Sequence, residues 1–228
     1  LVKEAACVRR AGNADMLMVQ AVAGQPAQAT TAAEKMLEHG AAGLVSFGVA
    51  GGLDPSLGAG VVVIASGVIG PDGATYPAHE RWVEALMQID GAFDSGAIVG
   101  SDEPVMTALD KRKLFRRHGA LAVDMESHAV AAVAKAAGVP FAAIRAIGDP
   151  AGRSIPRAAL AGLAPNGKTR ALPVIAAGTL ALSFGALSQF GMGRIDHHGL
   201  QIVLALATCL LILTSTEKPK RLIFAGIL

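Results

Sequence analysis

Short runs of apolar residues alternate with amphipathic stretches between residues 28 and 165. The runs are typical of buried strands, and they lie at 43–47, 61–65, 97–99, 120–123 and 141–147. Helical spacing or helix end signals predict helices at 30–39, 80–89, 107–118 and 125–137. Thr30 or Thr31 is the predicted cap of the first helix, which Gly40 stops. Buried strands separated by helices predict an α/β fold, with a parallel or mixed sheet flanked by helices on both faces.

The pattern changes after residue 170. Residues 171–193 and 199–216 carry no charged side chain, and apolar stretches of about 20 residues are typical of membrane spans. Basic residues follow the second run at Lys218, Lys220 and Arg221. They favour a cytoplasmic carboxyl terminus, and two spans would leave the preceding domain in the cytoplasm as well. The sequence therefore predicts one domain over 1–170 and an apolar helical extension over 171–228, a pattern that a gene fusion or a shifted reading frame would also produce.

Size and charge narrow the class of protein. A chain of 228 residues can form one α/β domain with a sizeable core. Such a domain would normally have a first strand just before Leu1, so we interpret the amino-terminal end as lacking that strand. The formal net charge of +2 resides in 171–228, and a neutral domain does not look like a nucleic-acid binder. Basic residues at 111–117 are interpreted as the solvated face of a helix. Cys7 and Cys209 show neither a disulfide framework nor a metal-ligand spacing, and we expect no metal.

Candidate chemistry gathers where two strands end. Asp124, Met125 and Glu126 follow the strand at 120–123, and Asp149 follows the strand that carries Arg145. Because ligands bind outside the carboxyl ends of strands in open α/β sheets, we expect these side chains at one site. A carboxylate pair suits sugar hydroxyls, a thioether suits a flat apolar face, and an aspartate at a strand end suits proton transfer.

A glycine-rich segment, Gly48-Val49-Ala50-Gly51, directly follows another strand and is predicted to be a loop. Glycines let backbone N–H groups approach phosphate, ribose or base edges closely. The segment is not the G-x-G-x-x-G fingerprint, which disfavours a dinucleotide-binding oxidoreductase.

Together, residues 46–55, 123–128 and 145–149 resemble the nucleoside phosphorylase and nucleosidase superfamily, which includes the methylthioadenosine/adenosylhomocysteine nucleosidases. The resemblance extends over roughly residues 1 to 175. Ser101-Asp102-Glu103-Pro104-Val105 and the Asp-Met-Glu-Ser-His sequence look most like the hopanoid-associated phosphorylases, which act on adenosylhopane. The resemblance implies cleavage of the N-glycosidic bond of a 5′-substituted adenosine, with release of adenine by phosphorolysis or hydrolysis.

The resemblance also implies roles for individual residues. Met125 and Glu126 match the pair that packs on the nucleoside and binds the ribose 2′- and 3′-hydroxyls, and Asp149 matches the acid that protonates N7 of the purine. Arg145 matches the strand arginine near that acid, and Glu4 matches a glutamate that positions water. The segment matching the loop beside ribose and base comprises Gly48, Val49, Ala50 and Gly51. Val49 and Gly148 stand where the nucleosidases usually carry serine.

These motifs favour an enzyme that needs no cofactor, with phosphate as a possible co-substrate. We expect a cytoplasmic homo-oligomer, anchored at the membrane if 171–228 span it. The alternative from another class is a membrane protein whose amino-terminal domain binds a nucleoside without turning it over.

Overall fold

The computed structural model describes residues 18–22, 24–89, 91 and 93–155. Glu4 and the predicted apolar extension at 171–228 lie outside the described residues. Within the described part of the chain, no helix is both long and apolar enough to cross a bilayer.

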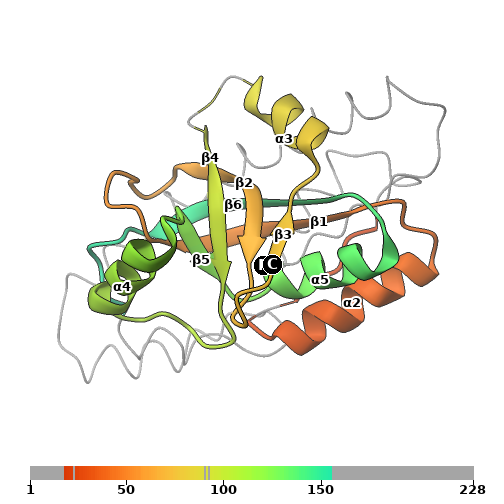
Figure 1. The fold of residues 1–228 in the computed structure, drawn as a ribbon, viewed down its shortest axis with the longest axis horizontal. Coiled ribbons are helices and arrows are strands. Elements are labelled where there is room, and N and C mark those ends of the chain that lie inside the picture. The colour runs from red at the N-terminus through yellow and green to blue at the C-terminus, as the bar shows by residue number, and fades with distance from the viewer. Residues whose placement is uncertain (1–17, 23, 90, 92, 156–228) are drawn as a thin grey trace, which may run out of the picture.

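The chain alternates helices and strands, as its hydrophobic pattern predicts (Figure 1). In order, the elements are α2 (Pro26–Glu38), β1 (Leu44–Gly52), β2 (Val62–Ile69), β3 (Thr75–Pro77), α3 (Glu80–Met87), β4 (Phe93–Gly100), α4 (Ala108–His118), β5 (Ala122–Asp124), α5 (Ser127–Ala137) and β6 (Phe141–Asp149). Every predicted strand and helix has a counterpart. The pattern missed β3, a three-residue strand at the edge of the sheet with no buried residue.

Some element boundaries differ from the predicted ones for local reasons. Helix α2 begins at Pro26, where the missing N–H of proline is not needed. The prediction that Thr30 or Thr31 caps it is therefore wrong, because both hydroxyls donate to carbonyls one turn back inside the helix. Helix α5 begins at Ser127, so Met125 and Glu126 lie in the connection between β5 and α5.

The strands form one mixed sheet in the order β3-β2-β4-β5-β1-β6, and β2 also pairs with β6. Five of the strands therefore close into a ring of pairings, which leaves β3 as an appended edge strand. The pairs β1–β6, β2–β4 and β4–β5 are parallel, whereas β1–β5, β2–β6 and β2–β3 are antiparallel. The predicted mixed sheet is confirmed.

Helices cover both faces of this sheet. In β2, Val63 and Ala65 join the core beneath α2 and α5, whereas Val62 and Ile64 pack with Trp82 of α3 on the other face. This alternation follows from successive strand side chains pointing to opposite faces. Figure 1 shows α2 and α5 side by side below the sheet, with α4 beside β4 and β5.

Candidate active site

The two motifs that the sequence predicts at one site lie on either side of β1. Gly51 of β1 pairs with Val123 of β5 on one side and with Asp149 of β6 on the other. Strands β5 and β6 are not neighbours, and β5 runs antiparallel to β1 whereas β6 runs parallel to it. The two motifs therefore flank a shared neighbour strand and do not end adjacent parallel strands, and their convergence at one site stays a prediction.

The glycine-rich segment is strand and not the predicted loop. Residues 48–51 continue β1 to Gly52, and they pair with β6 as far as Gly51. Gly51 lets the side chains of Asp149 and Val123 approach the backbone of β1 closely. A Cβ at this position would lie 3.3 Å from Asp149 Oδ2 and 3.3 Å from Val123 Cγ1. Any larger residue at this position would crowd the carboxyl group that ends β6.

Asp149 is the candidate proton donor. Its side chain is 22% exposed at the end of β6, and its Oδ2 accepts a hydrogen bond from the ammonium of Lys111. Burial raises the pKa of Asp149 above its ordinary value, although the Lys111 ammonium opposes that shift. A carboxyl group whose pKa is raised holds its proton to higher pH, which is what a general acid requires.

Lys111 is a site residue that the sequence pattern placed on the surface. The interpretation of 111–117 as a solvated face is wrong at this one position, because Lys111 is fully buried. Its place on α4 explains the difference: Leu114 and Phe115, three and four residues later, pack on the cluster formed with β4 and β5. Residues at this spacing share one helix face, so the periodicity of α4 carries a signal that Lys111 points inward.

Glu126 presents a second nearly buried carboxylate in front of α5. It is 8% exposed, and its Oε1 accepts a 2.6 Å hydrogen bond from the backbone N–H of Gly24. Burial, with help from the charge of Asp124, raises the pKa of Glu126, and Arg145 acts in the opposite direction. Met125 beside it is half-buried. No sequence signal pointed to Gly24, which contacts Glu126 from 102 residues away.

Arg145 does not lie beside Asp149, contrary to the prediction. Its Nε donates to Asp124 Oδ2 at 2.5 Å and its Nη2 donates to Ser46 Oγ at 2.7 Å, in a network that also includes Ser127. Both residues belong to β6, but Arg145 pairs with Gly48 and Asp149 with Gly51, and a register shift lies between these two pairs. Arg145 pairs with Asp124, the first carboxylate of the segment 124–126. The second carboxylate, Glu126, has no ion-pair partner among the described residues.

Next to Asp149, the surface of the sheet is apolar. Val49 is 59% exposed, and the adjacent Gly148 leaves its side-chain position open, with Val49 Cβ 3.8 Å from where a Cβ would lie. Two serines at these positions would instead present hydroxyl groups. This strip therefore offers packing rather than hydrogen bonds.

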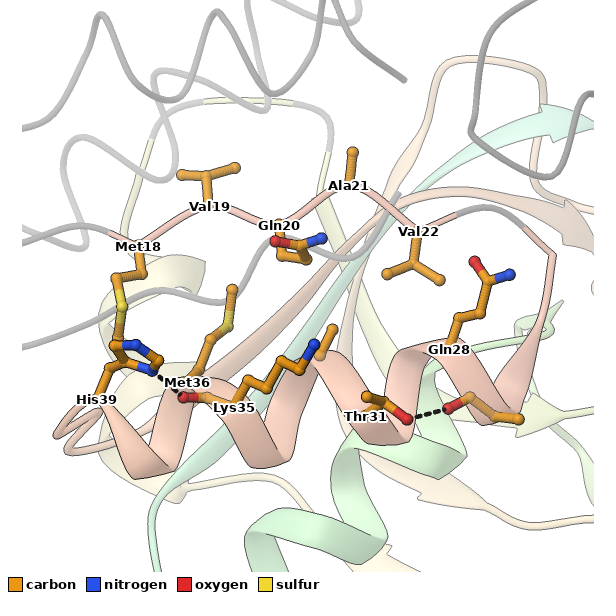
Figure 2. Close-up of a pocket in the computed structure, with 12 residues that line it drawn as sticks. Met18, Val19, Gln20, Ala21, Val22, Gln28, Thr31, Lys35, Met36 and His39 are labelled. Atoms are coloured by element: carbon orange, nitrogen blue, oxygen red, sulfur yellow. Dashed lines mark hydrogen bonds between the residues drawn. The ribbon is translucent and has the colours of Figure 1, made fainter.

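A hollow in the described surface lies elsewhere. Figure 2 shows it between residues 18–22 and α2, where Lys35 and His39 project along the helix. Its volume is about 740 Å³, and none of the predicted site residues lines it. Among the described residues, no group of three His, Cys, Asp or Glu side chains is arranged to hold a metal ion.

Comparisons with known proteins give the family and the fold of this chain. The sequence model of the phosphorylase superfamily matches residues 4–171. An S-adenosylhomocysteine nucleosidase from Streptococcus pyogenes, solved with 5-methylthiotubericidin, is 21% identical, with a TM-score of 0.62 over 83% of this chain and 76% of its own. The 5′-methylthioadenosine/S-adenosyl homocysteine nucleosidase of Campylobacter jejuni is 26% identical, with a TM-score of 0.53 over 57% of this chain and 66% of its own.

The corresponding nucleosidase of Helicobacter pylori is 24% identical, with a TM-score of 0.53 over 56% of this chain. This chain spans 64% of the length of that protein. At these identities the solved structures establish a common fold.

Proposed function

Because this chain belongs to the phosphorylase superfamily, we propose that it cleaves the N-glycosidic bond of a purine nucleoside and releases the free base. The observation that carries the proposal is the environment of Asp149, a mostly buried carboxyl group whose pKa burial raises. It lies across β1 from the motif that contains Glu126, through the pairing of Gly51 with both neighbouring strands.

The chemistry of the bond requires such an acid. When the bond between C1′ and the purine breaks, its electron pair moves to the base and positive charge develops on the ribose. A proton transferred from the Asp149 carboxyl group to N7 neutralises the departing base, and general acid catalysis of this kind contributes about 10²–10⁴-fold. The C1′–N bond breaks and the base leaves in its neutral form; water or phosphate then bonds to C1′, and the proton that water releases, or one from solvent in the case of phosphate, restores the Asp149 carboxyl group.

Glu126 suits the ribose. Each oxygen of a carboxylate can accept two hydrogen bonds, so Oε1 retains capacity for a hydroxyl after accepting from the Gly24 N–H, and Oε2 can accept from the second hydroxyl. We assign Met125 to packing against the nucleoside, because a thioether adapts to flat apolar surfaces. Arg145 acts on this part of the site through Asp124, which it holds in place.

The substrate class that we favour is a 5′-substituted adenosine with an apolar substituent, of which adenosylhopane is one example. The resemblance of residues 101–105 and 124–128 to the hopanoid-associated phosphorylases supports this choice. An enzyme anchored through 171–228 would meet such a substrate while its lipid part stayed in the bilayer. We also expect a homo-oligomer.

The experiment is a base-release assay on the full chain. Adenine release is measured from 5′-methylthioadenosine and from an adenosine bearing a long 5′-alkyl group, each with and without phosphate. The phosphate dependence separates phosphorolysis from hydrolysis. Release from neither substrate, with the chain folded, would contradict the proposal.

The Asp149→Asn variant tests the assignment of the acid. Turnover should fall by about 10²-fold or more, because the amide cannot supply the proton, while nucleoside binding measured by calorimetry should persist. Turnover close to that of the unmutated chain would move the proton donor to another residue.

A further inference from the structure

Lys111 has an environment that an ordinary structural lysine does not need. Its side chain is fully buried, and Nζ donates to Asp149 Oδ2 and to three backbone carbonyls. The carbonyls belong to Asp149 at 3.2 Å, Pro150 at 3.1 Å and Arg153 at 2.9 Å. An ammonium group has three N–H donors, so four oxygens account for all of its protons. This arrangement stabilises the charged form of Lys111 inside the protein.

The contacts gather around one short segment, the turn that follows β6. Two carbonyls of this turn and the carbonyl of Asp149 converge on Nζ, and two further hydrogen bonds tie the same turn to the start of α4. Ser154 Oγ accepts from the N–H of Ala108 at 3.1 Å, and the N–H of Ile155 donates to Met106 O at 2.8 Å. Lys111 therefore fixes both the backbone and the carboxyl group of Asp149.

We propose that Lys111 is the positioning residue of the proton donor, anchoring Asp149 through Oδ2 so that the transferable proton resides on Oδ1. The inference rests on the proposed function, in which Asp149 protonates the departing base. An oxygen that already accepts from an ammonium group is a poor site for a proton, which leaves the other oxygen of the carboxyl group. The anchored turn then holds that oxygen in one position with respect to the nucleoside.

The charge of Lys111 has a second consequence. When Asp149 gives up its proton it becomes a carboxylate, and the adjacent ammonium stabilises that product without any rearrangement. The same attraction limits how far burial raises the pKa of Asp149. Lys111 thus makes Asp149 a stronger acid. It also lowers the highest pH at which Asp149 stays protonated.

Burial and the Lys111 charge act in opposite directions on the pKa of Asp149, and this determines how the pH profile should change without Lys111. The acid must be protonated, so kcat/KM falls as pH rises through the pKa of Asp149. Removal of the Lys111 charge leaves burial unopposed, raises that pKa further, and moves the basic limb of the profile to higher pH. A nearby opposite charge favours the ionised carboxyl group, so we expect the limb to move to higher pH when that charge is removed.

The test compares pH profiles of base release for the unmutated full chain, Lys111→Met and Lys111→Gln, with Lys113→Met as the control. Lys113 lies on the same helix, but it is exposed and paired with Asp110. For both Lys111 variants, the plateau of kcat/KM should fall at least about tenfold and the basic limb should move to higher pH. The Lys113 variant should keep the profile of the unmutated chain. A lower plateau with an unmoved limb would reduce Lys111 to a purely structural role and overturn the proposal.

A second measurement needs neither folded Lys111 variants nor turnover. In the full chain labelled with ¹⁵N-lysine, the slowly exchanging ammonium resonance of buried Lys111 should shift when Asp149 ionises, and Asp149→Asn should abolish that shift. A resonance that does not respond to Asp149 contradicts the proposal. If the chain releases no base while the resonance responds, the proposed function fails but the pairing of Lys111 with Asp149 stands.

Discussion

The buried ion pair between Asp124 and Arg145 allows a quantitative prediction about the scaffold behind Glu126. Each side chain is 1% exposed, and Arg145 also donates to Ser46. Arg145→Met keeps most of the side-chain length but leaves the Asp124 carboxylate buried without a cation. Breaking a buried pair by removing one partner costs about 3–5 kcal/mol. Against a total stability of roughly 5–15 kcal/mol for a domain, this variant should be marginally folded.

A double-mutant cycle isolates the pair. Asp124→Asn alone leaves a buried guanidinium without its carboxylate and should be similarly costly. The double variant leaves no unpaired charge, so its cost should fall below the sum of the two single costs by about 1–3 kcal/mol. Urea unfolding of the full chain, followed by far-UV circular dichroism, gives the free energy of unfolding for each variant.

A matched control comes from the surface of α4. Lys113→Met removes an exposed pair with Asp110 and should leave the free energy of unfolding nearly unchanged. Strict additivity of the Asp124 and Arg145 substitutions would refute the reasoning, because it would mean that the two charges do not stabilise one another.

The same pair should influence activity through Glu126. Arg145 lowers the pKa of Glu126, whereas Asp124 raises it. Glu126 must be ionised to accept both ribose hydroxyls, so activity rises with pH through its pKa. Any Arg145→Met protein that folds should therefore show the acidic limb of its pH profile at higher pH. An unmoved limb would contradict an influence of Arg145 on the pKa of Glu126.

The remaining predictions concern the sugar and the membrane. Glu126→Gln loses the charged acceptor, which costs roughly 1.5–3 kcal/mol of transition-state binding with a ribonucleoside and less with the 2′-deoxy analogue; an unchanged ratio of kcat/KM for the two sugars would place the ribose contact elsewhere. Residues 171–228 should carry the full chain into the membrane pellet, with release only by detergent. Recovery in the supernatant after ultracentrifugation without detergent would remove the membrane interpretation.

The hydrophobic pattern predicted the fold because the buried strands and amphipathic helices leave strong local signals. The run at 141–147 and the helical spacing at 80–89 both became elements at nearly the predicted positions. Strand β3 left no such signal, since none of its three residues is buried. The glycines of β1 predicted a loop because glycine is a weak strand former. Pairing with β6 on one side and with β5 on the other nevertheless keeps the segment extended.

The site was predictable in its residue types but not in its partners. The motifs identified Asp149 and Glu126, whereas the cation beside each carboxylate depends on how the strands are ordered. The family resemblance implied that Arg145 lies near Asp149, which follows it on the same strand. In the structure Arg145 instead reaches Asp124 on β5, the other strand that borders β1, and Ser46 on β1 itself.

This strand order also gives the two ends of the proposed substrate separate electrostatic environments. Asp149 has its own cation, Lys111, and Asp124 behind Glu126, the proposed ribose acceptor, has another, Arg145. A single cation shared by both carboxylates would lower both pKa values together, although the acid must stay protonated while the ribose acceptor must be ionised. Separate cations on opposite sides of β1 allow burial and charge to be balanced independently at each end. Both protonation states coexist only at a pH below the pKa of Asp149 and above that of Glu126, so changes at Lys111 should move the upper edge of that range and changes at Arg145 its lower edge.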